Sequence, residues 1–247
     1  MIHIKSDRDI TLMKKAGNIV RDTLNLVGSL VKPGVSTKYL DKKAEEYILN
    51  CGAIPSFKGY YGFPATLCIS INNEVIHGIP SDRIIKDGDI VSVDCGANIC
   101  GFHADAARTF PCGNISEEAS DLIKITEESF FQGFKYAKEG NRVGDISSAI
   151  QEYVESNGYS VVKAFTGHGI GRELHEAPEV PNFGKKGFGA LLKKGMALAI
   201  EPMVNIGTEH IRVLDDNWTV VTQNGKLSAH YENTIIITLD GSEIITL

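Results

Sequence analysis

One sequence pattern occurs in both halves of the chain, and this repeat limits the folds that the chain can adopt. Residues 84–94 read Ile-Ile-Lys-Asp-Gly-Asp-Ile-Val-Ser-Val-Asp, and residues 191–201 read Leu-Leu-Lys-Lys-Gly-Met-Ala-Leu-Ala-Ile-Glu. The segments lie 107 residues apart, and each passes from a Lys-x-Gly turn signal through an apolar strand to an acidic residue. Chance similarity between two turn-and-strand patterns is the alternative to a duplication.

Helix signals also occur twice. Apolar residues recur with a period close to 3.6 over residues 6–31 and 37–51, which predicts two helices. Helical composition returns over residues 116–138, and Asp145 can cap a fourth helix that ends at Gly158. Each half therefore contains two helices followed by strands.

These patterns predict an α+β fold. Two helix–helix–strand halves, at about residues 1–112 and 113–247, would be related by a pseudo-twofold axis within a single domain. Their helices would cover one face of a curved, mostly antiparallel sheet. The chain has 247 residues, of which 43% are hydrophobic, so one such domain can bury a substantial core.

Charge and cysteine content exclude several classes of protein. The net charge is −6, and no basic run is present, which argues against tight binding of nucleic acid. No apolar run approaches the length of a membrane span, and residues 1–7 lack the apolar core of a signal peptide. The five cysteines are odd in number and form no Cys-x-x-Cys pair, which suits the reduced thiols of a cytoplasmic protein.

The segment from Asp94 to Asp105 carries the first chemical signal. β-branched strand patterns flank it on both sides, so residues 98–101 are expected to form the loop of a hairpin. That loop would place Asp94 directly opposite Asp105, and like charges in that position destabilise a hairpin. A divalent cation between the two carboxylates is one interpretation. Two solvated surface aspartates are the other.

The predicted symmetry would bring further acids to the same place. Glu201 and Glu232 come from the second half, and His168 lies in a Gly-rich loop where the backbone can approach closely. Four carboxylates and one imidazole suit two divalent cations about 3.5–4 Å apart that share a water molecule. An oxygen-rich set of ligands favours manganese, iron or cobalt without excluding zinc. Such a centre performs hydrolysis.

Five phrases of the sequence carry a resemblance to a known family. They are Cys-Ile-Ser-Ile-Asn (68–72), His-Gly-Ile-Pro (77–80), Gly-His-Gly-Ile-Gly (167–171), Glu-Pro-Met (201–203) and Asp-Asn-Trp-Thr-Val (216–220). With the spacing of the acids and His168, they make the whole chain resemble the bacterial type I methionine aminopeptidases. The resemblance implies the pita-bread fold and a single catalytic metallopeptidase domain, without a zinc-finger extension or the helical insert of the type II enzymes. It also implies removal of the initiator methionine from nascent proteins when the second residue is small.

The resemblance implies a role for each residue of the site. Two divalent ions (cobalt, manganese, iron or zinc) would be held by Asp94, Asp105, His168, Glu201 and Glu232. Glu201 would also be the base for the attacking water. His175 would contact the scissile amide and stabilise the tetrahedral intermediate, and His77 would contact the same amide and help to protonate the leaving nitrogen. Outside these motifs, each histidine would more often be an ordinary surface or core residue, as we expect for His3, His103, His210 and His230.

The resemblance also implies an apolar pocket for the methionine side chain, since burial and dispersion are the main means of recognising a thioether. Its residues would be Tyr60, Phe63, Cys68, Leu174 and Trp218. Phe63 stands where the family usually has Tyr, and Leu174 stands where it usually has Phe. Both remain apolar, so the preference for methionine should survive, whereas the width of the pocket is left open.

Three competing functions share parts of this pattern. A proline-specific peptidase of the same fold would have the same five ligands, but such relatives usually carry a long N-terminal domain for which this chain has no room. A peptide-binding member without activity would typically lose ligands, and all five are present. A dinuclear hydrolase for another substrate is excluded only by assay. The implied partner is a nascent chain near the ribosome, and we expect a monomer in the cytoplasm without tight binding of RNA or attachment to a membrane.

Overall fold

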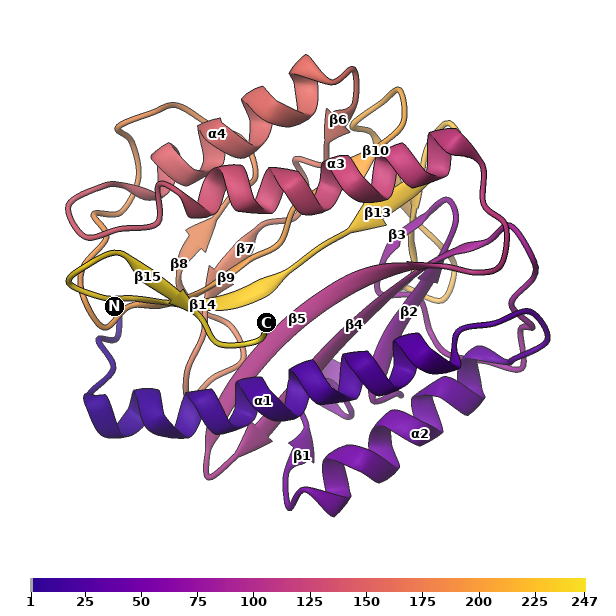
Figure 1. Cartoon of the computed structure of the whole chain (residues 1–247), viewed down its shortest axis with the longest axis horizontal. Helices are drawn as coiled ribbons and strands as arrows, with labels where there is room; N and C mark the ends of the chain where they lie inside the picture. The colour runs from indigo at the N-terminus through magenta and orange to yellow at the C-terminus, as the bar shows by residue number, and fades with distance from the viewer. Residues whose placement is uncertain (1) are drawn as a thin grey trace.

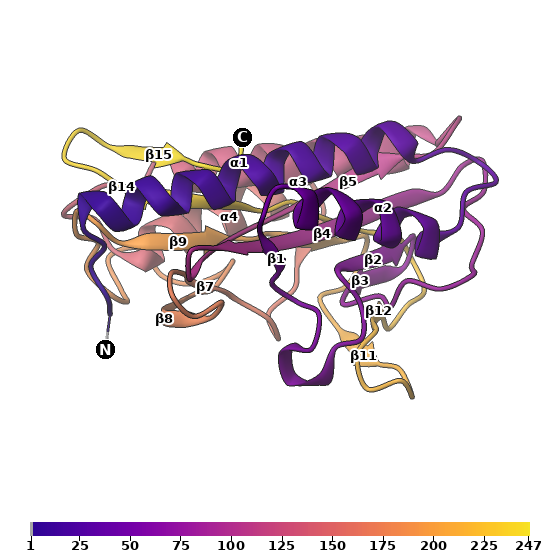
Figure 2. The same cartoon turned by 90° about the horizontal axis from the view of Figure 1, so that it is seen from below.

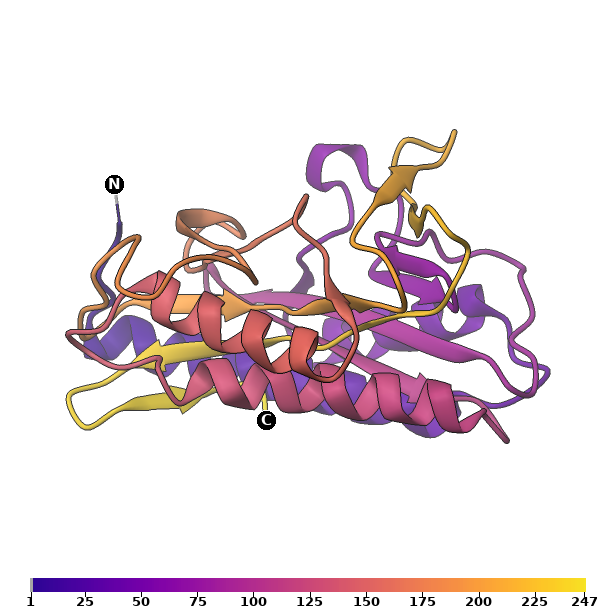
Figure 3. The same cartoon turned by 90° about the horizontal axis from the view of Figure 1, so that it is seen from above.

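The computed structural model describes residues 2–247, in which four helices pack on one face of a set of antiparallel sheets (Figure 1). The helices are α1 (Asp7–Leu30), α2 (Thr37–Asn50), α3 (Glu117–Phe134) and α4 (Val143–Ser156). Figure 2 shows the helices on one side of the sheets and, on the other, the short 3-10 segment η1 (Tyr60–Gly62) with β11 (Ile211–Val213) and β12 (Val220–Thr222). Figure 3 shows the same arrangement from the opposite direction.

The strands form two main sheets, one in each half. The first half contains β1 (Ile54–Pro55), β2 (Leu67–Ile71), β3 (Glu74–Ile76), β4 (Ile90–Ile99) and β5 (Phe102–Pro111). The second half contains β6 (Ser160–Val161), β7 (Gly167–Gly169), β8 (Glu176–Val180), β9 (Ala197–Ile200), β10 (Met203–Asn205), β11 (Ile211–Val213), β12 (Val220–Thr222), β13 (Ser228–His230), β14 (Asn233–Ile237) and β15 (Ser242–Ile244). In the first main sheet β4 pairs with β1, β2 and β5, and the second has the order β15-β14-β9-β7-β8. Two three-stranded sheets, β13-β10-β6 and β11-β12-β3, complete the set.

The predicted α+β fold with an internal duplication is confirmed. Helices α2 and α4 each have 14 residues. The Gly34 amide donates to the Ile85 carbonyl (2.9 Å), and the Gly140 amide donates to the Leu192 carbonyl (3.1 Å), at equivalent places in the two halves. Two apolar cores lie beneath the helix pairs, one drawn mostly from the first half, including Met13, Leu40 and Leu67, and the other mostly from the second half, including Phe130, Ile146 and Leu198.

The helix boundaries follow from capping. Ser6 caps α1, because its hydroxyl accepts from the Asp9 amide (3.2 Å) while the Asp9 carboxylate accepts from the Ser6 amide (3.0 Å). The prediction that Asp145 caps α4 is wrong by one turn. Arg142 occupies the cap position, and Asp145 lies at the third helical position, where its carboxylate accepts from the Arg142 amide (2.7 Å).

The β4–β5 hairpin is tighter than predicted. Ile99 pairs with Phe102, so its loop is Cys100-Gly101 and not residues 98–101. Cys100 and Gly101 have φ values of 55° and 78°, which match the type I′ turn of a two-residue hairpin. The prediction of a four-residue loop is wrong because cysteine is uncommon at a left-handed position, so the sequence does not indicate a two-residue turn at Cys100-Gly101.

The tighter loop changes how Asp94 and Asp105 face each other. Asp94 pairs with Ala107, and Asp105 pairs with Gly96, so the two aspartates are diagonal neighbours and not direct opposites. Side chains alternate along a strand, and the error in register is two residues. Both carboxylates therefore stay on one face of the hairpin, as the interpretation with a metal requires.

Three other strand predictions need correction. The strand that follows Asn72-Asn73 returns beside β2, where the Ile69 amide donates to the Gly78 carbonyl (2.8 Å), but its ladder is formed with β12 from the second half and not with β2. Strand β6 covers only Ser160–Val161 of the expected 160–165. The long strand expected over residues 229–238 is divided into β13 and β14, and Glu232 lies in the interruption.

The two halves meet along a seam, in which β5 runs beside residues 230–234. The Asp105 amide donates to the Thr234 hydroxyl (2.9 Å), which donates to the Asp105 carbonyl (2.8 Å). Thr109 makes the same reciprocal pair of hydrogen bonds with the backbone of His230 (2.9 and 3.0 Å). Threonine hydroxyls therefore satisfy backbone groups that a regular ladder would have paired.

A second set of contacts closes this seam. The Glu232 amide donates to the Ala107 carbonyl (3.0 Å). The half-buried Arg108 guanidinium donates to the Glu232 carbonyl (2.6 Å) and to the Asn233 side chain (2.7 Å). The backbone of Glu232 is thereby fixed against β5 on both sides, which sets where its carboxylate lies.

Among residues 2–247, no helix has both the length and the apolar character that crossing a bilayer demands.

Thr234→Val should lower the free energy of unfolding by about 1–3 kcal/mol, because the isosteric change leaves the buried amide and carbonyl of Asp105 without partners. Urea denaturation of the metal-free protein measures this effect. Thr126→Val in α3 is the matched control, since the buried Thr126 hydroxyl donates only to a carbonyl of its own helix (Leu122, 2.7 Å). Equal losses for the two variants would contradict the seam's role.

Candidate metal centre and active site

A cavity of about 210 Å³ is lined by residues of the sheets and of the loops beside them. All twelve residues predicted for the site line it: Tyr60, Phe63, Cys68, His77, Asp94, Asp105, His168, Leu174, His175, Glu201, Trp218 and Glu232. They come from both halves of the chain. Phe57 and Tyr61 also line the cavity and were not predicted, although they belong to the loop rich in Gly and Tyr that precedes β2.

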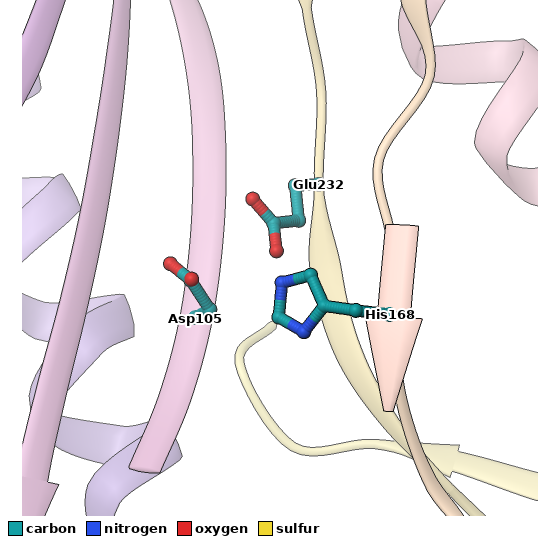
Figure 4. A group of neighbouring side chains, drawn as sticks. All are labelled: Asp105, His168 and Glu232. Carbon is teal, nitrogen blue, oxygen red and sulfur yellow. The ribbon is translucent and has the colours of Figure 1, made fainter. Parts of the chain in front are cut away.

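The centre of the cavity brings three potential metal ligands together. Asp105, His168 and Glu232 each offer one ligand atom, and these atoms all lie within 4.8 Å of one another (Figure 4). They project from β5, from β7 and from the gap between β13 and β14. The His168 Nε2 atom is also 3.6 Å from Oε1 of Glu201, which extends the group along β9. Asp94 lines the same cavity from β4.

Burial makes the ionised forms of these acids costly in the absence of a cation. Desolvation raises the pKa of Asp105 to about 7, and desolvation together with the neighbouring carboxylates raises the pKa values of Asp94, Glu201 and Glu232 well above their ordinary range. In the described part of the chain, no lysine or arginine forms an ion pair with any of the four. One buried oxygen on each of Asp94, Asp105 and Glu232 has no hydrogen-bond partner. Free carboxylate oxygens that converge in this way fit divalent cations.

His168 is a neutral imidazole that could bind a metal ion through Nε2. Its Nδ1 atom lies 2.8 Å from the Gly169 carbonyl, and because a carbonyl can only accept, Nδ1 must carry the proton. The Nε2 lone pair is then free and faces the acids (Figure 4). Burial lowers the pKa of His168 to about 3, so the ring is neutral at neutral pH. A backbone partner of this kind also fixes the orientation of a ligating imidazole.

His175 borders the acids and is exposed to the cavity. Its ring centroid lies 4.3 Å from that of His168, and its Nδ1 atom is 3.1 Å from the Tyr60 hydroxyl. Partial desolvation lowers the pKa of His175, so it too is neutral at neutral pH. If Tyr60 donates to Nδ1, Nε2–H of His175 is available to donate into the cavity.

His77 has an unusual backbone conformation, and its ring packs against two aromatic side chains. It has a left-handed φ of 60°, which is uncommon outside glycine. Its ring meets Phe165 and Trp218 edge-on, at centroid distances of 5.6 and 6.3 Å. Desolvation lowers the pKa of His77 to about 4, which leaves the ring neutral at neutral pH.

An apolar pocket adjoins the acids. Phe63 and Leu174 are almost fully buried, and the ring of Phe63 packs edge-on against Trp218 at 5.1 Å. Cys68 on β2 is paired with Asp94 on β4, so a residue of the pocket and one of the acids lie side by side on neighbouring strands. Burial, with the nearby carboxylates, raises the pKa of Cys68 well above its usual value, and its thiol stays neutral and apolar. All five predicted pocket residues border this space.

The histidines expected to be structural lie outside the cavity lining. His103 is half-buried, with its ring nitrogens 2.8 Å from the Ser56 hydroxyl and 2.7 Å from the Asn98 amide. His230 is buried, and its Nε2 atom lies 3.9 Å from Oε2 of Glu232. Their positions agree with supporting roles.

Comparison with known proteins places this site in a family. The pattern of metallopeptidase family M24 matches residues 11–239. A methionine aminopeptidase of Clostridium perfringens is 62% identical, and the alignment covers 100% of this chain and 99% of that protein. The crystal structure of a methionine aminopeptidase from Rickettsia prowazekii superposes with a TM-score of 0.99 at 40% identity and covers 100% of both chains.

Proline-specific enzymes have the same fold at greater distance. An Xaa-Pro dipeptidase from Bacillus anthracis gives a TM-score of 0.79 at 27% identity, and 98% of this chain covers 61% of that one. The match is therefore weaker and leaves more than a third of that enzyme without a counterpart here. The chain belongs to metallopeptidase family M24, among the methionine aminopeptidases.

Proposed function

We propose that this protein hydrolyses the peptide bond after an N-terminal methionine, with two divalent metal ions in the cavity between its halves. One observation carries the proposal: four carboxylates and a neutral imidazole converge beside an apolar pocket with room for a methionine side chain. We assign the metal ligands as Asp94, Asp105, His168, Glu201 and Glu232. Bound ions would supply Lewis acidity that polarises the scissile carbonyl and makes a water molecule more acidic.

The protein residues then have separate tasks. Glu201 lies at the end of β9 beside His168 and takes the proton of the attacking water. His175, oriented through Tyr60, donates Nε2–H to the oxygen that becomes negative in the tetrahedral intermediate. His77 contacts the same amide and helps to protonate the departing nitrogen by a hydrogen bond, and the proton itself is the one that Glu201 has taken from the water. Since both histidines are neutral, each can donate without adding charge to the resting site.

The pocket supports selection of methionine. Phe63, Leu174 and Trp218 form an apolar wall, and Cys68 adds a neutral sulfur that suits a thioether. We propose that the substrates are nascent chains near the ribosome with a small second residue, that the enzyme is a cytoplasmic monomer, and that residues 1–247 act as one catalytic domain. The metal in the cell is cobalt, manganese, iron or zinc.

A peptide panel tests the proposed function. Protein stripped of metal and refilled with Mn, Fe, Co or Zn should release methionine from Met-Ala-Ser but leave Met-Leu-Ser, Leu-Ala-Ser and Ala-Pro-Ser intact. Glu201→Gln and His175→Ala should each lower kcat/KM by about 100-fold or more, since each removes a group that acts in the transition state. Cleavage of Ala-Pro-Ser would instead indicate a proline-specific enzyme. No cleavage with any metal would reject the proposal in favour of a binding protein.

Removal of metal should make stability depend on pH in a defined direction. The pKa of Asp105 is about 7 in the folded protein, against about 4 in an unfolded chain. The unfolded state therefore binds fewer protons between these values, so the metal-free protein loses stability as pH rises from about 4 to 7. A divalent cation replaces these protons and should raise Tm more at pH 8 than at pH 5.

Thermal unfolding with EDTA or with Mn²⁺ at each pH measures this effect. Asp105→Asn is the control, because it removes one of the four ionisable groups and should weaken the dependence of the metal-free Tm on pH, of which the raised pKa values of Asp94, Glu201 and Glu232 leave a part. A gain in Tm from Mn²⁺ that is as large at pH 5 as at pH 8 would contradict the assignment.

Leu174→Ala tests the pocket. Leu174 is 2% exposed and borders the space assigned to the methionine side chain. Loss of its buried carbons should raise KM for Met-Ala-Ser about 10-fold or more, with a smaller change in kcat. Leu192→Ala is the matched control, since that leucine is fully buried in the second core and does not line the cavity. It should lower Tm and leave KM within about twofold, and an unchanged KM for Leu174→Ala would remove Leu174 from the pocket.

A further inference from the structure

One buried ion pair lies outside the proposed catalytic residues. Nζ of Lys5 is 2.6 Å from Oε2 of Glu176, and the two side chains are only 5% and 7% exposed. In every other ion pair that a lysine or arginine makes within residues 2–247, the cationic side chain is at least 36% exposed. Exposed pairs contribute little, whereas breaking a buried pair leaves an uncompensated charge. This pair is therefore the one most able to hold its surroundings in place.

The second carboxylate oxygen of Glu176 binds the backbone of the loop formed by residues 171–176. Oε1 accepts hydrogen bonds from the backbone amides of Arg172 (2.9 Å) and Glu173 (3.3 Å). Gly171 packs directly against the ion pair, because a Cβ atom there would lie 2.6 Å from Oε1 of Glu176 and 2.6 Å from Cε of Lys5. One carboxylate thus fixes both the beginning and the end of residues 171–176.

Lys5 ties this loop to distant parts of the chain. Its Nζ atom also donates to the His3 carbonyl (3.0 Å), and its amide donates to the Gly195 carbonyl (2.7 Å). Gly195 belongs to the turn that leads into β9, the strand that ends just before Glu201. The ion pair therefore connects the segment before α1, the turn before β9 and the start of β8.

The loop carries His175, which has few other restraints. The side chain of His175 has one hydrogen-bond partner in the described structure, the Tyr60 hydroxyl at 3.1 Å. Its backbone lies directly before Glu176, which pairs with Gly169 one residue after His168. The direction of the His175 ring therefore depends on the backbone of the loop.

We infer that the Lys5–Glu176 ion pair positions His175 for the reaction by fixing the backbone of residues 171–176. The inference rests on the proposed function, since it concerns the residue assigned to the scissile amide. Neither Lys5 nor Glu176 lines the cavity that holds the four acids, whereas Glu176 lines an adjoining hollow with His175 and Glu201. The Glu176 oxygens are bonded to Lys5 and to the loop amides, so both residues are positioning residues and do not touch the reacting atoms. Displacements of about 1 Å can cost about 100-fold in rate, so a small shift of the loop is enough to matter.

Glu176→Gln tests the inference in two backgrounds. Glutamine keeps the size of the side chain and one oxygen for the two amides but removes the charge. With His175 present, kcat for Met-Ala-Ser should fall about 10- to 100-fold while KM changes less than about threefold. In the His175→Ala background, the same substitution should change kcat by less than about twofold, because the residue through which it acts is gone. Lys5→Arg, which keeps the charge, should retain kcat within about threefold.

Lys14→Met is the matched control. Lys14 pairs with Glu243 at 2.8 Å, but both side chains are more than 40% exposed, so kcat should not change. If Glu176→Gln does not fold, Lys5→Met combined with Glu176→Gln removes both buried charges and should show the same loss of kcat. Thermal unfolding establishes which variants are folded at the assay temperature.

The outcomes separate this inference from the proposed function. An unchanged kcat for Glu176→Gln, or an equal loss with and without His175, would overturn the positioning role while the enzyme remains a methionine aminopeptidase. Failure of the metal-loaded wild-type protein to release methionine would instead overturn the proposed function, and this inference with it.

Discussion

Repulsion among carboxylates at the seam between the two halves is the constraint on which the rest of the structure depends. Asp105 and Glu232 are fully buried, and Asp94 and Glu201 complete the group. No lysine or arginine in the described chain pairs with them, so the site needs protons or cations to be stable. The guanidinium of Arg108, next to the site, donates to the backbone carbonyls of Ala107 and Glu232 and forms no ion pair with the four acids.

The scaffold meets this constraint by fixing backbone and leaving the carboxylates free. The Thr234 hydroxyl forms hydrogen bonds with both the backbone amide and the backbone carbonyl of Asp105, so the Asp105 carboxylate is not needed as a partner for the backbone. Glu232 lies in an interruption between two strands, where its backbone bonds to Ala107 and Arg108. The interruption between β13 and β14 therefore matters for the site. In a continuous strand, the direction of the Glu232 side chain would be determined only by the alternation of side chains across the sheet.

Local patterns and internal repeats made much of the fold and the five proposed metal ligands predictable, because the order of turns, strands and acids along the chain survives errors in local geometry. The other seven predicted residues of the cavity lining came only from the resemblance to the methionine aminopeptidases. The register of the hairpin was not predictable, since cysteine is not a residue type that indicates a left-handed conformation, which Cys100 nevertheless adopts. The pairing of β3 with β12 was missed because it joins segments about 145 residues apart, and local turn signals favour a neighbour. The Lys5–Glu176 pair, separated by 171 residues, leaves no mark in the sequence either.

Burial acts in opposite directions on the two kinds of ionisable group in the cavity, and this sets every protonation state in the site. It raises the pKa values of the acids, so that the metal-free centre retains protons, and lowers those of His77, His168 and His175, so that the rings stay neutral. In the proposed site, bound divalent cations would reverse the first effect, and His168 would be a neutral ligand. The neutral His77 and His175 would keep their N–H groups for the substrate. Burial of the ionisable groups would therefore prepare both the proposed metal ligands and the proposed hydrogen-bond donors for the same reaction.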